Sequence, residues 1–595
     1  MKRLLVIGGA SFDILHLRDG TVHSVGGAGL YTTMAARRCG ALVSMFSPRP
    51  SPCPDSIAPV AERLSEWMGP VVDPEELPRF EISYRPRTTE YLNISLGAEA
   101  ELLPDMLPED LSIYDYIHIT SLRDSSTQRS FIEACRRRGA KRISAGTYPR
   151  EVSEHPEAVL EIAEQTDCFF MNQWEAITLF GSLASIKVKP GKLLYITAGA
   201  EGAYIIQGDH ISKIPSAPAV ELDPTGAGDS FCGAVLAYLL QNKHPVMAAR
   251  YAASLAAEMI GQVGPAALLS TDPAPGPSLD PRVRANNIQI EKIAAMLSAL
   301  SEVAPYPFVS PELPPVGHPK ALEFFFAATL QQFSFWTTRN NRYSQPLLAR
   351  IGGLERKGSD YLWQALNQQL ELDDTFCSPG RQSNLSRQEL LEVFRSDDGA
   401  DVMPALDLHL EQAHSYGRDM LALGVTPQDL LREAQNAEKP LAALLSFLDH
   451  IGGYKEDPLR KKSSLLALIL KDRPEGFLPI GPQEELAPII DYHLMRSVLR
   501  TGLVDVIDEE LKSKLISRQV ISPEEEWAVR YLSYQVIAEL TELSGKSAGA
   551  VDQFFFRSRK RCPEMSEPDC ESCALDPVCA HRKELFQPVL RTSNY

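Results

Sequence analysis

At residues 223–230 the chain reads Asp-Pro-Thr-Gly-Ala-Gly-Asp-Ser, between a strand-like run and an apolar segment, 231–240, with helical periodicity. Its small residues allow backbone N–H groups to converge at the start of a helix, where unpaired donors and the helix dipole favour an anion. We therefore predict a phosphate-binding loop at Gly226, Ala227 and Gly228. Asp229 follows, where a carboxylate can accept the proton of a hydroxyl that attacks a phosphoryl group. An aspartate that only caps this helix is the alternative.

Further motifs flank this octet, in the chain order that follows. The first is a short apolar strand at 2–8 followed by Asp13, and the second is the pair Gly26 and Gly27 before a helical segment at 30–39. The third is an Asn-x-x-Glu element at Asn172 and Glu175. The fourth is a strand and turn at 194–203 that contains Thr197, Gly199 and Gly202. The whole set resembles the ribokinase-like (PfkB) kinases of sugars and nucleosides over residues 1–270. This resemblance implies an α/β three-layer sandwich with a small β lid, and ATP and Mg²⁺ as cofactors.

The resemblance also implies a role for each matching residue. Asp229 is the catalytic base, and Gly226, Ala227 and Gly228 hold the transferring phosphate. The remaining residues divide into a nucleotide and metal side, with Asn172, Glu175, Thr197, Gly199 and Gly202, and a substrate side, with Asp13, Gly26, Gly27, Tyr31 and Asp223.

One residue departs from the family pattern. Many sugar kinases of the family have a substrate-binding Asn after the glycine pair, where this chain has Tyr31. The Tyr31 ring could stack on a base or a sugar, although an aromatic residue on a helix is more often part of the core. The identity of the substrate therefore stays open.

Length and charge limit the classes of function. A chain of 595 residues is too long for one core, and its composition is ordinary for a globular protein. The net charge of −18 disfavours nucleic acid as a partner without excluding it, since phosphate-backbone affinity needs clustered Lys and Arg. We find no signal peptide and no apolar run long enough for a membrane span, and expect a cytoplasmic location and no membrane partner. A homodimer is one assembly that the sequence leaves open.

The pattern of elements changes near residue 270. Before it, short apolar runs alternate with helical segments, which is typical of a mostly parallel sheet, and strand-like parts of 80–102 could form the lid. Residues 271–286 form a Pro-rich linker. Residues 287–595 are helical in character, and we expect an all-α domain there.

Four cysteines occur close together near the C-terminus. Cys562, Cys570, Cys573 and Cys579 are separated by seven, two and five residues. Four thiolates at this density indicate a closed structural metal loop that holds a 4Fe-4S cluster or Zn²⁺. The loop resembles the iron–sulfur loop of helix-hairpin-helix glycosylases such as endonuclease III, whose first gap is one residue shorter, so the type of metal stays open.

Other motifs of the helical half resemble a second family. They are 331–336, which contains Phe335 and Trp336, the pair 352–353 with the helical segment 361–366, a lysine-bearing segment at 457–464 with Lys461, and 489–494 with Asp491 and Tyr492. They resemble the queuosine salvage proteins, which hydrolyse the N-glycosidic bond of queuosine 5′-phosphate and have a glycosylase-like helical fold. The resemblance implies a catalytic Asp491 and Lys461, with Phe335, Trp336 and Tyr492 against the base.

The chemistry of such a cleavage suits these residue types. A carboxylate such as Asp491 stabilises an oxocarbenium-like sugar, and Lys461 can hold a phosphate or polarise the leaving base. Each residue also has a structural interpretation, since Asp491 could be a helix cap, Lys461 an exposed lysine, and the aromatic residues a core stripe.

We therefore expect a bifunctional enzyme. The first half would phosphorylate a nucleoside or pentose, and the second would release a base by N-glycosidic hydrolysis. The alternatives are a sugar kinase fused to a nucleic-acid glycosylase or binding module, and a kinase with a non-catalytic helical scaffold.

Overall fold

The computed structural model describes residues 2–85, 88–301 and 306–595, so positions 86–87 of the expected lid segment lie outside it. The chain divides into two compact units, 1–278 and 279–595, with the boundary inside the expected linker 271–286. Among the described residues, no helix is both long and apolar enough to cross a membrane.

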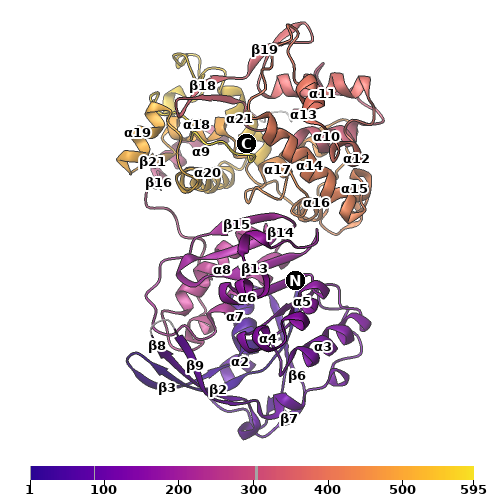
Figure 1. Cartoon of the computed structure of the whole chain (residues 1–595). Helices are drawn as coiled ribbons and strands as arrows, with labels where there is room; N and C mark the ends of the chain where they lie inside the picture. Colours follow the sequence, from indigo (N-terminus) through magenta and orange to yellow (C-terminus); the bar gives the residue numbers. More distant parts are fainter. Residues whose placement is uncertain (1, 86–87, 302–305) are drawn as a thin grey trace. The chain divides into compact units, whose positions relative to one another are not determined.

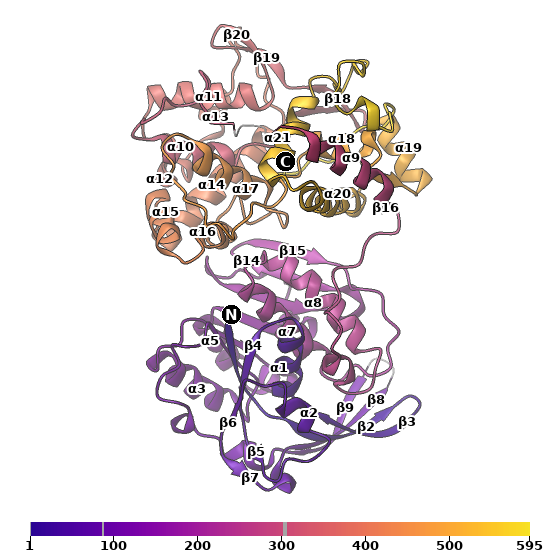
Figure 2. The ribbon, with the colours of Figure 1, turned by 180° about the vertical axis from the view of Figure 1, so that it is seen from behind.

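The first unit is built around one nine-stranded sheet, drawn in indigo to magenta in Figures 1 and 2. Seven neighbouring strands are parallel and two antiparallel strands, β14 and β15, close one edge. The order is β15 (His210–Ile214), β14 (Ala203–Gln207), β13 (Leu193–Thr197), β12 (Cys168–Asn172), β11 (Ile143–Gly146), β10 (Tyr116–Ile119), β1 (Arg3–Ile7), β4 (Leu42–Phe46) and β6 (Glu66–Met68). The parallel strands are continuously apolar because helices cover both faces.

The two faces of this sheet have separate apolar cores. One contains helices α1 (Ala28–Arg38), α7 (Ala227–Leu240) and α8 (Pro245–Met259), and the other contains α3 (Ser125–Arg137) and α5 (Pro156–Gln165). The expected three-layer α/β sandwich is therefore confirmed.

A smaller four-stranded sheet forms the lid of this unit, in the order β3 (Gly20–Gly26), β2 (Ser11–Leu17), β8 (Arg79–Arg85) and β9 (Thr88–Ser95). These strands lie side by side at one end of the unit in both views (Figures 1 and 2). The lid therefore draws on the segment just after the first strand as well as on the predicted 80–102.

The second unit is mainly helical and is drawn in rose-pink through orange to yellow in Figure 1. Its longer helices are α9 (Asn287–Ala299), α10 (Ala321–Thr329), α11 (Ser359–Leu372), α14 (Leu406–Leu423), α15 (Pro427–Asn436), α16 (Pro440–Leu448), α17 (Lys461–Asp472), α18 (Tyr492–Thr501), α19 (Glu509–Ser517), α20 (Pro523–Ser544) and α21 (Ala548–Ser558).

This unit departs from the expected all-α class. Three two-stranded sheets occur among its described residues. They pair β16 (Val283–Ala285) with β21 (Val504–Val506), β17 (Trp336–Arg339) with β18 (Arg342–Pro346), and β19 (Leu348–Ile351) with β20 (Leu354–Lys357). Two of them are short hairpins with exposed positions, which give little apolar alternation to read in a sequence.

Candidate functional site

The octet forms the turn into helix α7. Gly226 has a φ of 73°, and a side chain there would collide with the ring of Tyr31, 2.3 Å from the position of a Cβ atom. Gly228 is exposed, and a Cβ there would have no atom within 4 Å. The first N–H groups of α7 have no partner within the helix. The loop therefore offers backbone donors on an open side, as an anion site requires.

Asp223 holds this loop in shape. One carboxylate oxygen accepts the N–H of Thr225 at 2.9 Å, and the other accepts the N–H of Gly264 at 2.7 Å. The Thr225 hydroxyl contacts the hydroxyl of Tyr84, on lid strand β8, at 2.7 Å. Because both Asp223 oxygens are engaged, the structure places this residue as a support of the loop and not on an open substrate face.

Asp229 lies in the first turn of α7 and is half-buried. Burial raises its pKa to about 6. Glu175 caps α6 (Gln173–Phe180) together with Asn172: the Asn172 N–H donates to the Glu175 carboxylate at 2.7 Å and the Glu175 N–H to the Asn172 side chain at 2.9 Å. Burial, and secondarily the charge of Asp229, raise the pKa of Glu175 to about 7. Two carboxylates that repel each other in this way fit a bound cation such as Mg²⁺.

Asp13 and the glycine pair, expected on the substrate side, lie on β2 and at the end of its neighbour β3, just before α1. Asp13 is 3% exposed and lies directly over Gly26, where a Cβ would be 2.0 Å from its carboxylate. Burial raises the pKa of Asp13 to about 6. A Cβ at Gly27 would lie 2.6 Å from the carbonyl oxygen of Gly9, so the glycine pair allows two backbone segments to touch.

Tyr31 is in the core and not on an open face. It is 1% exposed, with its ring against Gly226. Its hydroxyl is buried without a hydrogen-bond partner among the described residues. Burial, then the charges of Asp223 and Asp13, raise its pKa well above the ordinary value. Stacking of this ring on a substrate is not available in this arrangement, although the hydroxyl is close to the acidic groups.

Thr197, Gly199 and Gly202, which we expect on the nucleotide side, lie at the turn between β13 and β14. Thr197 ends β13, and Gly199 and Gly202 have φ values of 54° and 97°. A Cβ at Gly202 would be 2.0 Å from the carbonyl oxygen of Ile214, so this turn is compatible only with glycine at that position.

Sequence reasoning missed three groups near this site. Tyr91, on lid strand β9, has a pKa raised by burial and then by Asp229, Asp13 and Glu175, which places its hydroxyl within their electrostatic reach. Glu99 lies against Gly9, and burial raises its pKa to about 7. Tyr84 contacts Thr225. None of them belongs to a motif, because lid residues reach the loop only in the folded chain.

Comparison with known proteins agrees with this geometry. Residues 82–272 match the pfkB family carbohydrate kinase model. The N-terminal unit contains a PfkB carbohydrate kinase domain. It is 24% identical over 249 residues to a cytidine kinase of Thermococcus kodakarensis, covering 40% of this chain and 88% of that protein. It is 28% identical over 151 residues to a ribokinase of Lactococcus lactis, covering 24% of this chain and 48% of that protein.

Solved structures are also similar to the kinase domain. An adenosine kinase from Sinorhizobium meliloti is 19% identical, with 44% of this chain and 95% of that chain covered and a TM-score of 0.38. A Burkholderia thailandensis nucleoside kinase in complex with inosine is 17% identical, with 46% and 94% covered and a TM-score of 0.39.

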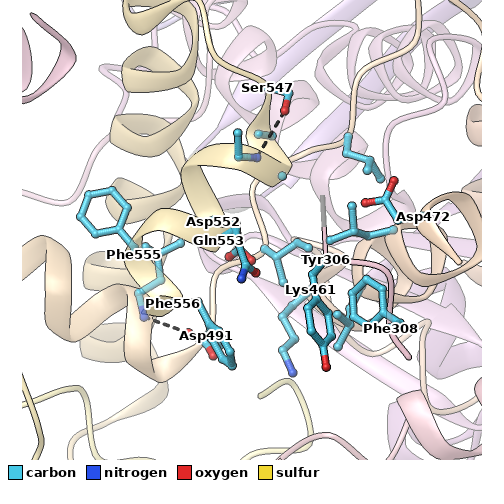
Figure 3. A pocket seen from close by; sticks show the side chains of 18 of the residues that line it. Tyr306, Phe308, Lys461, Asp472, Asp491, Ser547, Asp552, Gln553, Phe555 and Phe556 are labelled. Atoms are coloured by element: carbon cyan, nitrogen blue, oxygen red, sulfur yellow. Dashed lines mark hydrogen bonds between the residues drawn. The ribbon is translucent and has the colours of Figure 1, made fainter. Parts of the chain in front are cut away.

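The second unit contains a cavity of about 1150 Å³. Four residues that sequence analysis selected line it: Phe335, Lys461, Asp491 and Tyr492. Figure 3 shows Lys461 and Asp491 beside this space, together with Asp552 of helix α21, which no motif indicated. These groups come from three helices, α17, α18 and α21, and from the residue before strand β17, and the fold brings them together.

Lys461 is the first residue of α17 and is 6% exposed. Its ammonium group donates to the carbonyl oxygen of Gln332 at 2.7 Å, and burial lowers its pKa to about 8. Asp491 is the N-cap of α18, where one oxygen accepts the Leu494 N–H at 2.8 Å. Asp491 therefore is a helix cap, as the structural interpretation expects, and its carboxylate also faces the cavity.

Trp336 does not line the cavity. It is 1% exposed, stacks on Tyr343 with ring centroids 5.4 Å apart, and packs edge-on against Phe586. Phe335, the residue before strand β17, lines the cavity, although both side chains belong to the same apolar core. The expected contact of Trp336 with a base is therefore replaced by a core role.

The four C-terminal cysteines are all free and half-buried, and they line one small cavity of about 40 Å³. The Arg500 guanidinium donates to the sulfur of Cys562 at 3.2 Å, and the His581 N–H donates to that of Cys579 at 3.3 Å. Burial raises the pKa of Cys579, and the three neighbouring sulfurs raise it further.

An alternative donor set lies at the same loop. Single ligand atoms of Cys570, Asp576 and His581 are all within 4.8 Å of one another.

Proposed function

We propose that the kinase domain transfers the γ-phosphoryl group of ATP to a hydroxyl group of a nucleoside or pentose. One observation carries this proposal: Asp229, a carboxyl group with a pKa raised to about 6, stands beside the open face of Gly228 at the start of α7. At neutral pH this carboxylate can accept the proton of the attacking hydroxyl, while the loop N–H groups stabilise the transferring charge. The names of the curated relatives, cytidine kinase and ribokinase, support this class of substrate.

The other residues of the domain suit the remaining parts of this reaction. Asp13, above Gly26, would accept hydrogen bonds from ring hydroxyls, and Tyr31 would limit the space next to the loop. Thr197, Gly199 and Gly202 would shape the adenosine side. Asn172 and Glu175 would hold Mg²⁺, which supplies charge neutralisation on the phosphates when bound.

A second activity is proposed for the helical unit: hydrolysis of an N-glycosidic bond. The supporting observation is the cavity itself, which places Asp491, Lys461 and the flat side chains of Phe335 and Tyr492 around one space. Asp491 would stabilise positive charge on the sugar and orient water, and the aromatic side chains would contact the base. Lys461, fixed by the Gln332 carbonyl, would bind the 5′-phosphate or polarise the base.

The charge of the cavity bears on the class of ligand. Acidic side chains outnumber basic ones in its lining, with Glu312, Asp360, Asp472, Glu484, Glu485, Asp491, Glu542 and Asp552 against Lys461, Lys471 and Lys546. Such a lining repels a polyanion and favours a base that carries a protonated amine. It therefore supports a modified, queuosine-like nucleoside over the alternative of a nucleic-acid glycosylase.

The cysteine loop is proposed to hold a metal centre. Four sulfurs around one small cavity, with N–H donors to two of them, fit a 4Fe-4S cluster or tetrahedral Zn²⁺. The ligands would be structural, because all four positions come from the protein.

Product analysis tests both activities together. The purified protein would be incubated with Mg-ATP and a panel of nucleosides, including 7-deazaguanine types, and separately with ribose. We expect mass spectrometry to detect a nucleoside 5′-phosphate first and the free base later. Phosphorylation of ribose alone, with every nucleoside unchanged, would remove the coupled hydrolase and leave a kinase with a helical scaffold. Ribose that is first released from a nucleoside and then phosphorylated would reverse the order.

A further inference from the structure

A second carboxyl group, that of Asp552, belongs to the cavity of the helical unit. It lies on α21, whereas Asp491 begins α18 and Lys461 begins α17. Figure 3 shows Asp552 projecting from α21 into the same space. Among residues 2–85, 88–301 and 306–595, its carboxyl group has no hydrogen-bond partner and no ion pair, whereas the Asp491 carboxylate accepts a backbone N–H.

The electrostatic surroundings separate the two carboxyl groups. Burial and the charge of Asp491 raise the pKa of Asp552 to about 8, and Lys461 and Arg559 oppose this effect. The group is therefore mostly protonated at neutral pH, so that it can donate a proton. A proton donor and a fixed carboxylate in one cavity are the two parts that a glycosidic hydrolysis needs.

The neighbouring candidates for a proton donor are already engaged. The Lys461 ammonium group donates one N–H to the Gln332 carbonyl, and its other N–H groups are assigned above to the 5′-phosphate or the base. His493 lies 3.4 Å from Glu564, and burial and then the nearby Arg496 hold its pKa well below the usual range, so the ring is neutral. Asp360 also lines the cavity with a raised pKa, whereas the charge of Asp491 contributes to the raised pKa of Asp552 and so places Asp552 within electrostatic reach of the fixed carboxylate.

We propose that Asp552 protonates the leaving base, an inference that rests on the hydrolase activity proposed above. Water attacks the anomeric carbon and gives one proton to Asp491. The C–N bond breaks, its electron pair goes to the base nitrogen, and that nitrogen takes the proton of Asp552. Transfer of the proton from Asp491 to Asp552 through solvent restores both groups, so that one water is consumed for each base released.

The test compares two leaving groups in the full-length protein. One substrate is the 7-deazaguanine nucleoside 5′-phosphate that the wild type hydrolyses fastest, and the other is 4-nitrophenyl β-ribofuranoside 5-phosphate, whose nitrophenolate leaves without protonation. We expect Asp552→Asn to lower kcat for the nucleoside by about 100-fold or more and for the nitrophenyl substrate by less than about threefold. We also expect the wild-type rate on the nucleoside to fall above about pH 8, and this limb to be absent in the variant.

Control variants separate the role of Asp552 from a structural effect. Asp508 accepts the Leu511 N–H at 2.7 Å and does not line the cavity, so Asp508→Asn is a matched change of carboxylate to amide that should leave both rates unchanged. Asp552→Glu, which retains an acid, should keep more activity on the nucleoside than Asp552→Asn, and thermal melting checks folding of each. Equal losses on both substrates in Asp552→Asn would overturn the inference while leaving the hydrolase intact. A wild type that releases no base from any nucleoside phosphate would overturn the hydrolase itself.

Discussion

The proposed phosphate loop of the kinase domain and the cavity of the helical unit share one feature but are assembled in different ways. Each places an aspartate at the start of a helix, Asp229 in the first turn of α7 and Asp491 as the N-cap of α18. In the loop, the proposed anion site and the proposed base are neighbours in sequence. In the cavity, Asp491, Lys461 and Asp552 come from three helices. A contiguous site is visible as a motif, whereas a site assembled by packing is visible only in the fold.

The largest effect is expected for Asp229→Asn. The amide cannot accept a proton, so ATP-dependent phosphorylation should fall by about 10²–10⁴-fold while the loop keeps its shape. Transfer of phosphate from labelled ATP measures this, with thermal melting as the check on folding. An unchanged rate of phosphorylation would show that Asp229 is not the base.

Asp491→Asn tests the aspartate in the cavity of the helical unit. Asparagine also caps helices, so α18 should keep its stability, but base release should fall by about 10²–10³-fold because the cationic transition state loses its counter-charge. Phosphorylation should be unaffected.

A matched control for the Asp491 change is Asp508→Asn. Asp508 caps α19 through a 2.7 Å bond from the Leu511 N–H and does not line the cavity. Equal losses of base release in both variants would mean that Asp491 acts only as a cap.

The pH dependence of phosphorylation tests the surroundings of the Asp229 carboxyl group in the loop. A raised pKa means that Asp229 is a proton acceptor only above about pH 6, and Asp13 titrates in the same range. Well below pH 6, kcat/KM should therefore fall about tenfold for each pH unit if only Asp229 must be ionised, and about 100-fold if Asp13 must be ionised too. A rate that stays constant down to pH 4.5 would contradict the buried environment of Asp229.

The metal loop is tested by elemental analysis of protein purified without oxygen. We expect iron or zinc in the wild type and its loss in Cys562→Ser, together with a lower Tm of the helical unit. Cys53→Ser, at an exposed cysteine of the other unit, should retain the metal. Wild-type protein that contains neither metal would contradict the proposed centre.

The smallest effect is expected for Tyr84→Phe in the lid. The change removes only the hydroxyl that contacts Thr225 at 2.7 Å. Loss of one hydrogen bond of about 1 kcal/mol should lower kcat/KM about fivefold. Tyr204→Phe, on strand β14 of the main sheet, serves as the control and should leave kcat/KM unchanged. An equal effect of both changes would argue against a link between the lid and the loop.

The sequence predicts the regular parts of this protein well. The apolar strands of the kinase domain and the helical character of residues 287–595 follow from the sequence pattern. Helices α19 and α21 have a weaker signal in the sequence. Charged residues crowd α19, and α21 begins with small residues, so neither gives a clear apolar stripe.

The candidate sites were predictable only in part. The glycines of the loop carry their own signal because each one permits a backbone that other residues cannot adopt. No sequence pattern marks Asp552 as a site residue, since an aspartate on a helix is ordinarily solvated and only packing brings this one near Asp491. Phe335 and Trp336 show the same limit, since two adjacent aromatic residues look alike in sequence and only one lines the cavity.

The most direct test of the proposed sequence of reactions combines the two aspartate variants. Asp229→Asn and Asp491→Asn would each be given Mg-ATP and a 7-deazaguanine nucleoside, alone and mixed, with the products followed by mass spectrometry over time. We predict that Asp229→Asn leaves the nucleoside unchanged but releases base when supplied with the 5′-phosphate, that Asp491→Asn accumulates the 5′-phosphate, and that the mixture restores base release. Base release from the unphosphorylated nucleoside by Asp229→Asn would contradict the account.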